Sequence, residues 1–227
     1  MGVLEIRGLR AGYGAAEVVH DVDLSIESGE FVGLVGRNGM GKSTTMKALF
    51  GMARRFSGTV MLDGVPLEQP DAMARRGATF MPEDRGVMAA LSVRDNLRLA
   101  RRHGYAPAVD PLEEFPMLRE RANQAMGTLS GGQQQLVGIA RAIYAGSRLI
   151  VVDELTQGLQ PSIVAQVFRV LEDVARSGVG VLVVDQSPQW VSRSVHRVLV
   201  MDSGRIVYDS PASADTAQVV SDLLILS

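Results

Sequence analysis

The chain has 227 residues, of which 46% are hydrophobic and 21% charged, a composition ordinary for a globular protein and sufficient for one or two domains. Its formal net charge of -2 lacks the overall basic character typical of nucleic-acid-binding proteins, so no nucleic acid is expected as a partner. Cysteine is absent, which excludes disulfides, thiolate catalysis and zinc–thiolate sites. The longest apolar runs, such as 149–152 and 179–184, are far shorter than the roughly 20 residues of a membrane-spanning helix.

The first predicted elements are strands at residues 3–7 and 22–27. A hairpin is predicted in TVMLDGVPL, with Asp63 and Gly64 as its turn, because Asp-Gly between apolar segments is a strong hairpin signal. These strands are expected to form an N-terminal antiparallel β subdomain.

Continuous apolar runs, in which hydrophobic and polar residues do not alternate, predict strands that are buried on both faces of a parallel sheet. The runs are FVGLV (31–35), LIVV (149–152) and VGVLVV (179–184). Each is followed by a polar or glycine-containing turn and then by a predicted helix, at 42–52, 161–177 and 188–196. Such an alternation is typical of α/β proteins with a mainly parallel core sheet.

The segment from about 92 to 128 is more charged and mostly helical in pattern. Candidate helices are SVRDNLRLARR and PLEEFPMLRERANQ, joined by the loop HGYAPAVD. We expect one domain over residues 1–227, in which a helical subdomain at about 92–128 is inserted between core segments 1–91 and 129–227.

The strongest motif is GRNGMGKST, which lies between a predicted buried strand and a predicted helix. It fits G-x-x-x-x-G-K-S/T, a loop whose backbone N–H groups curl around phosphates at a helix N-terminus. Lys42 is expected to contact the β- and γ-phosphates of ATP, and Ser43 to bind Mg²⁺. The predicted nucleotide-binding residues of the loop are Gly36, Arg37, Asn38, Gly39, Met40, Gly41, Lys42, Ser43 and Thr44.

The segment RLIVVDE ends a predicted buried strand in two acidic residues. Asp153 would lie at the carboxyl edge of the sheet, where ligands bind in such folds, and would hold Mg²⁺ through water or through Ser43. Glu154 is the candidate for polarising the attacking water. An Asp-Glu pair alone would more often cap a helix, but combined with the phosphate loop it predicts a site of nucleotide hydrolysis.

The segment LSGGQQQ predicts a second site at which backbone groups bind an anion. Ser130 and Gln133 form the S-x-x-Q pattern of a capping box at the start of a helix. Such a cap does not need Gly131 and Gly132, each of which disfavours a helix by about 1 kcal/mol relative to alanine. Glycines are explained if a ligand approaches the backbone closely, so this helix end is expected to serve a nucleotide held by another chain.

LSGGQ resembles the signature of ATP-binding cassette (ABC) ATPases, and residues from about 3 to 209 carry motifs in that family's order. The resemblance implies the P-loop NTPase fold of an ABC cassette. It also implies a head-to-tail pair, formed by two copies of this chain or by this chain and a homologous cassette subunit. Each ATP would lie between the phosphate loop of one cassette and the signature of the other. In that arrangement Ser130, Gly131, Gly132 and Gln133 complete the partner's site.

The resemblance places further residues. Tyr13 matches the aromatic side chain that stacks on adenine. Glu83, after Met-Pro, falls in the loop that reaches Mg²⁺ and couples to the membrane partner, which makes it another expected Mg²⁺ ligand. Gln186 stands where most cassettes have a catalytic histidine in contact with the γ-phosphate. A glutamine can donate a hydrogen bond there but cannot relay a proton.

Glu83 and Gln186, together with GRNGMGKST and ATFMPEDRGVMAALSVRDNL, are similar to one branch of the family, the LivF-type ATPases of branched-chain amino-acid importers. That branch implies a cytoplasmic subunit on the inner membrane, which works with transmembrane permease subunits and a periplasmic solute-binding protein. Leu155 stands where a proline is common and Gln157 where the branch usually has an acid, so the detail of the dimer interface stays open.

Other functions remain open at this stage. Importers of urea or short amides have closely similar ATPases. A soluble ABC ATPase of cofactor assembly would also fit, as would an ATP-gated clamp with little hydrolysis, which Glu83 and Gln186 would explain.

Overall fold

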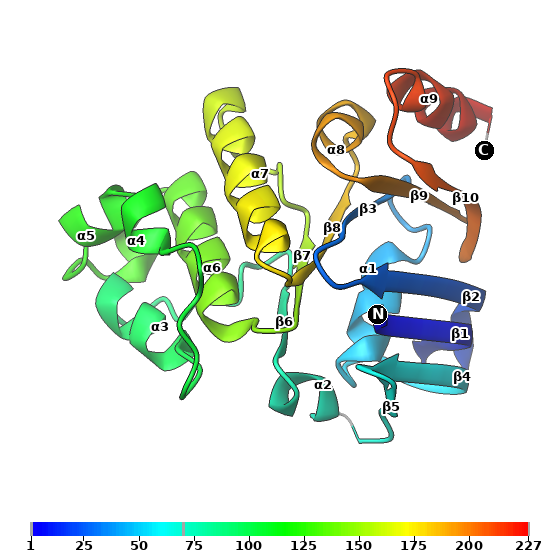
Figure 1. Cartoon of the computed structure of the whole chain (residues 1–227), viewed down its shortest axis with the longest axis horizontal. Coiled ribbons are helices and arrows are strands. Elements are labelled where there is room, and N and C mark those ends of the chain that lie inside the picture. Colours follow the sequence, from blue (N-terminus) through cyan, green and yellow to red (C-terminus); the bar gives the residue numbers. More distant parts are fainter. Residues whose placement is uncertain (1, 70, 227) are drawn as a thin grey trace.

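The computed structural model describes residues 2–69 and 71–226, while Met1, Pro70 and Ser227 lie outside the described part. Two sheets organise the described residues (Figure 1). The larger has the strand order β10-β9-β3-β8-β7-β6, and the smaller the order β2-β1-β4-β5.

The larger sheet is parallel except at β10, which pairs with β9 in the antiparallel sense. Its strands are β3 (Phe31–Val35), β6 (Ala78–Met81), β7 (Leu149–Asp153), β8 (Gly180–Asp185), β9 (Arg197–Asp202) and β10 (Arg205–Pro211). Every residue of β3, β7 and β8 is buried, which confirms the expected mainly parallel core sheet.

Neighbouring residues of a core strand face different hydrophobic cores. In β3, Phe31 and Val35 pack with the helices on one side, whereas Val32 and Leu34 pack toward the antiparallel sheet. Since side chains of a strand alternate between its faces, a strand covered on both sides is apolar throughout. This double burial fixes the carboxyl ends of β3, β7 and β8, from which the site residues project.

The smaller sheet is antiparallel and is formed by β1 (Gly2–Tyr13), β2 (Ala16–Glu27), β4 (Arg54–Leu62) and β5 (Val65–Pro66). Asp63 and Gly64 have φ values of 51° and 72°, which confirms the predicted hairpin turn of two left-handed residues. The first two strands are longer than expected. Their pairing contains several register shifts, as between Ile6 and Leu9, which blur the alternation of the sequence.

The helices around the core sheet are α1 (Lys42–Leu49), α2 (Ala72–Arg75), α6 (Gly131–Ala145), α7 (Pro161–Arg176), α8 (Pro188–Ser194) and α9 (Thr216–Leu226). Helix α1 ends three residues before the predicted residue 52, because Gly51 adopts a left-handed conformation with φ 71°. Among the described residues, no helix is both long and apolar enough to cross a membrane.

The segment predicted as a helical subdomain contains α3 (Val93–Ala100), α4 (Pro111–Glu114), α5 (Met117–Glu120) and the short 3₁₀ helix η1 (Met126–Thr128). Figure 1 shows α3, α4 and α5 together beside α6, far from the antiparallel sheet. The single helix expected over 111–124 is wrong. Pro116 disfavours a helical conformation at Phe115, whose φ and ψ are -124° and 78°.

Candidate active site

The phosphate loop joins the end of β3 to the start of α1, as the motif predicts. A Cβ atom on Gly36 would lie 2.4 Å from the carbonyl oxygen of Met201, so only glycine fits there. Gly39 and Gly41 have φ values of 84° and 100°, which other residues rarely adopt. The loop can therefore curl tightly in front of the N-terminus of α1.

Lys42 bridges this loop from within. Only 4% of the residue is exposed, and Nζ donates hydrogen bonds of 2.7 Å and 2.9 Å to the carbonyl oxygens of Gly36 and Arg37. Burial lowers the pKa of Lys42, and the negative charges of Glu154 and Asp153 act in the opposite direction. The ammonium group is thus held at the loop by groups that phosphate oxygens could replace.

Asp153 ends β7, and only 1% of the residue is exposed. Burial raises the pKa of Asp153, whereas a hydrogen bond from Ser43 and the charge of Lys42 lower it. Among the described residues, Oδ1 of Asp153 has no hydrogen-bond partner. A buried carboxylate oxygen without a partner, beside a serine hydroxyl, fits a Mg²⁺ ion.

Glu154 has the left-handed φ of 54°, and its N–H donates to the carbonyl oxygen of Val184 in β8 at 2.8 Å. Oε1 of Glu154 accepts a hydrogen bond of 2.8 Å from Nε2 of Gln186. Burial raises the pKa of Glu154, and the hydrogen bond from Gln186 lowers it. Gln186 is predicted to contact a γ-phosphate, and in the structure its amide donates a hydrogen bond to the carboxylate of Glu154.

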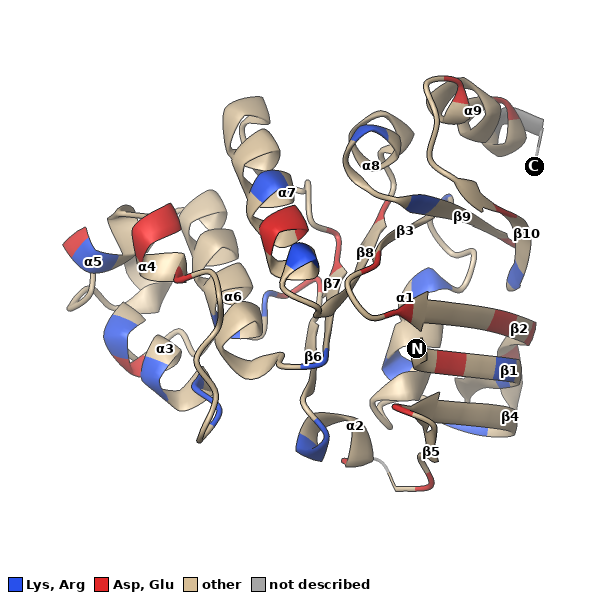
Figure 2. Cartoon of the chain, in the orientation of Figure 1, with Lys and Arg blue, Asp and Glu red and all other residues tan. Residues whose placement is uncertain are grey.

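Lys42, Glu154 and Gln186 line one hollow of about 350 Å³, whose lining does not include Asp153. It is lined by Val18, Asn38, Gly39, Gly41, Lys42, Ser43, Thr44, Glu83, Glu154, Gln157 and Gln186. Figure 2 shows acidic residues where the chain leaves β7 and β8, across from the start of α1. Tyr13 is not among the lining residues; it ends β1 with 47% of the residue exposed. The structure thus brings the phosphate loop, Glu83, Glu154 and Gln186 together.

The signature segment lies elsewhere, at the start of α6. Oγ of Ser130 accepts from the N–H of Gln133 at 3.3 Å, and Oε1 of Gln133 accepts from the N–H of Ser130 at 3.0 Å. This confirms the predicted capping box. A Cβ atom on Gly132 would meet the carbonyl oxygen of Gly158 at 3.4 Å, an ordinary contact. Packing within the chain therefore does not require glycine at this position.

Residues 19–157 match the family described as ABC transporter.

The chain is an ABC transporter ATP-binding domain.

It is 36% identical over 218 residues to the high-affinity branched-chain amino acid transport ATP-binding protein BraG of Pseudomonas aeruginosa, a match that covers 92% of this chain and 94% of that protein. It is 33% identical over 220 residues to the lipopolysaccharide export system ATP-binding protein LptB of Escherichia coli, with 91% and 90% covered. A solved ATP-binding subunit of an ABC transporter superposes with a TM-score of 0.85 at 26% identity, with 99% and 98% covered. The expected ABC cassette fold is confirmed over nearly the whole chain, and the chain is an ATPase.

Asp185, a buried carboxylate at the end of β8 of this ABC ATPase, is not among the site residues predicted from the sequence. It accepts hydrogen bonds from the N–H and the hydroxyl of Thr156, at 2.8 Å and 2.9 Å, and from the N–H of Ser187 at 2.9 Å. Asp185 thereby ties the turn after Glu154 to β8. Its signal was present in VLVVDQ, which ends an apolar strand in an acid as LIVVDE does.

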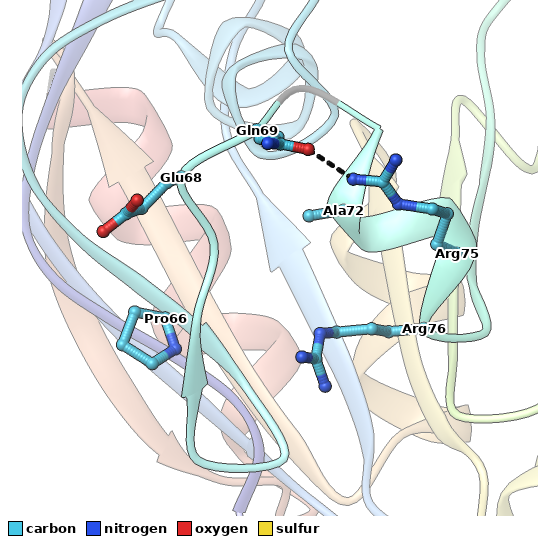
Figure 3. Close-up of a pocket in the computed structure, with 6 residues that line it drawn as sticks. All are labelled: Pro66, Glu68, Gln69, Ala72, Arg75 and Arg76. Carbon is cyan, nitrogen blue, oxygen red and sulfur yellow. Dashed lines mark hydrogen bonds between the residues drawn. The ribbon is translucent and has the colours of Figure 1, made fainter.

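A second hollow of the ABC ATPase, about 360 Å³ in volume, lies beside β5 and α2 (Figure 3). Its cationic side chains include Arg75, which donates a hydrogen bond of 2.6 Å to Oε1 of Gln69 and forms an ion pair with Asp71 at 2.6 Å. The lining contains no residue of the phosphate loop, so this hollow is separate from the site.

Proposed function

We propose that this ABC ATPase is the energy-supplying subunit of an importer for branched-chain amino acids. It would sit on the cytoplasmic face of the inner membrane, with transmembrane permease subunits and a periplasmic solute-binding protein as partners. The similarity to BraG over nearly the full length of both chains carries the proposal. Glu83 and Gln186, the residues typical of that branch, lie in one hollow with the phosphate loop and support it.

In the proposed site, the phosphate loop and Lys42 bind the β- and γ-phosphates of ATP. When ATP binds, phosphate oxygens would replace the carbonyl oxygens of Gly36 and Arg37 as hydrogen-bond acceptors of the ammonium group. The buried charge therefore has hydrogen-bond partners both with and without ATP. The N–H groups at the start of α1 and the helix dipole favour the same anion.

Ser43 and Asp153 are the proposed ligands of Mg²⁺, directly or through water, and Glu83 would add a third oxygen. Oδ1 of Asp153 lacks a partner among the described residues, and Glu83 lies on the wall of the same hollow. Bound Mg²⁺ would neutralise part of the phosphate charge.

Glu154 is the proposed general base. The oxygen of a water molecule attacks the γ-phosphorus, the bond from that phosphorus to the β–γ bridging oxygen breaks, and the carboxylate accepts the proton of the water. Burial raises the pKa of Glu154, which makes it a stronger base than an exposed carboxylate. Gln186 orients the carboxylate through its hydrogen bond to Oε1.

The signature residues and Tyr13 lie outside the lining of this hollow. The signature residues Ser130, Gly131, Gly132 and Gln133 would complete a site in the partner, because they line no part of their own chain's hollow within the described residues. Tyr13, half exposed at the end of β1, would stack on adenine. The partner is a homologous cassette subunit or a second copy of this chain.

A second candidate is the ATPase of an exporter, which the similarity to LptB favours. An importer of urea or short amides is the alternative within import, and a soluble assembly ATPase lies outside transport.

Deletion of the gene in its native host separates these functions. We expect loss of uptake of radiolabelled leucine, isoleucine and valine, restored by the wild-type gene but not by Glu154→Gln. Lost urea uptake with normal leucine uptake would reassign the solute. Normal uptake of both would contradict the importer.

A further inference from the structure

Helix α6, which begins at the signature, is connected to the end of strand β7 through one buried side chain. Gln135, on the second turn of α6, is only 3% exposed. Its Nε2 donates hydrogen bonds of 3.3 Å to the carbonyl oxygens of both Glu154 and Leu155. These carbonyls belong to the left-handed residue after β7 and to its neighbour. A left-handed glutamate is strained, so its conformation depends on the contacts that hold it.

The oxygen of the same amide accepts a hydrogen bond from the loop that carries Glu83. Nε of Arg85 donates to Oε1 of Gln135 at 3.2 Å, and an amino group of Arg85 donates to Oε1 of Gln134 at 3.2 Å. The N–H of Arg85 donates to the carbonyl oxygen of Pro82 at 2.8 Å, which fixes the loop on itself. The amide of Gln135 thus bonds two segments outside its own helix.

We propose that Gln135 is a positioning residue for Glu154 and that it couples the carboxylate to the signature helix and to Arg85. The proposal rests on the proposed function, in which Glu154 activates water. A nucleotide of the partner chain that seats on Ser130 at the start of α6 would shift this helix, and with it the peptide that aims Glu154.

Gln134 provides a matched control on the same helix. It also accepts from Arg85, but its Nε2 donates to the carbonyl oxygens of Met126 and Leu129, at 3.1 Å and 3.2 Å, and none of its hydrogen bonds reaches β7. A glutamate at either position keeps the size and the acceptor for Arg85 but cannot donate to carbonyl oxygens when ionised. The two variants therefore differ in which peptide they release.

The test compares Gln135→Glu with Gln134→Glu in single-turnover hydrolysis, with the chain in excess over ATP. Loss of a hydrogen bond that aims a reacting group predicts about a tenfold fall in the rate for Gln135→Glu. We expect its Kd for a fluorescent ATP analogue to stay within about twofold of wild type, because the phosphate loop is untouched. Amide hydrogen exchange across 153–157 should accelerate in Gln135→Glu alone.

Equal rates in Gln135→Glu and wild type would overturn the proposal, as would an equal loss in Gln134→Glu. Arg85→Gln, which changes a partly exposed loop residue, should also lower the rate with unchanged Kd, and it decides the question if Gln135→Glu fails to fold. The proposed function is tested separately by Glu154→Gln. If that variant is inactive and Gln135→Glu is normal, only the positioning role fails.

Discussion

The side-chain amide of Gln186 donates a hydrogen bond of 2.8 Å to Oε1 of Glu154. An amide has no proton to give up near neutral pH, so Gln186 can orient the carboxylate but cannot share its acid–base work. The proposed chemistry therefore rests on Glu154 alone, and the pH dependence of hydrolysis should follow this single carboxyl group.

Glu154→Gln should remove the proposed base while keeping the shape of the site. We expect hydrolysis to fall by about 10²–10⁴-fold, the usual contribution of a positioned general base. Binding of ATP should persist, because Lys42 and its loop are unchanged. Phosphate release and titration with a fluorescent nucleotide measure the two effects. Hydrolysis close to the wild-type rate would refute the assigned role.

Gln186→Leu should move the acid limb of the pH–rate profile to higher pH. The hydrogen bond from Gln186 favours ionised Glu154 and lowers its pKa, so its loss raises that pKa further above the ordinary value. The base is then protonated over more of the acid range, and the rate at neutral pH should fall about tenfold, as for a lost hydrogen bond to a charged group. An unchanged acid limb would show that Glu154 does not control it.

Asp153→Asn should stabilise the chain in the absence of nucleotide. Because burial raises the pKa of Asp153, its contribution to stability is present below the ordinary aspartate pKa and is lost as the pH rises through the raised value. At neutral pH the ionised carboxylate lowers stability, and its replacement should raise Tm by about 2–4 °C. The gain should vanish near pH 4. Addition of Mg²⁺ to ATP should increase the stabilisation by ATP in the wild type but not in the variant; an equal effect of Mg²⁺ on both would contradict Asp153 as a metal ligand.

Gly132→Ala should impair the function of the signature without impairing the folding of the chain. The new Cβ atom would meet the carbonyl oxygen of Gly158 at 3.4 Å, so the chain should fold and α6 should gain up to about 1 kcal/mol of stability. Hydrolysis should fall about 100-fold or more, because the Cβ atom would displace the partner's nucleotide.

Gly138→Ala is the contrasting change in the same helix. Its Cβ atom would lie 2.9 Å from Cε of Met81 and 3.0 Å from the carbonyl oxygen of Arg85, so overpacking should cost about 1–3 kcal/mol. Thermal unfolding distinguishes the two variants. A destabilised Gly132→Ala with normal hydrolysis would mean that this glycine serves packing.

The sequence predicts most strongly what depends on neighbours along the chain. The loop before Lys42 and the capping box of Ser130 are set by local conformation, and the structure shows both. The target of Gln186 depends on the pairing of β7 with β8, which brings Asp153 opposite Val184. The contacts of Gln135 depend on how α6 packs against that strand end. Neither leaves a pattern in the sequence, because the partners are 32 and about 20 residues away.

In the proposed head-to-tail pair, each ATP site is shared by two chains. Lys42→Ala removes the phosphate-loop lysine and leaves the signature intact, whereas Gly132→Ala alters the signature and leaves the phosphate loop intact. Each variant alone should be inactive in a head-to-tail pair of this chain. A mixed pair has one intact site, formed by the phosphate loop of one variant and the signature of the other.

The most direct measurement is ATP hydrolysis by an equimolar mixture of Lys42→Ala and Gly132→Ala at a chain concentration where the wild type is active. Random pairing in a two-fold dimer predicts recovery well above either variant alone and up to about a quarter of the wild-type rate, since half of the pairs are mixed and each has one of two sites. A mixture as inactive as its components, beside an active wild type, would contradict the shared site.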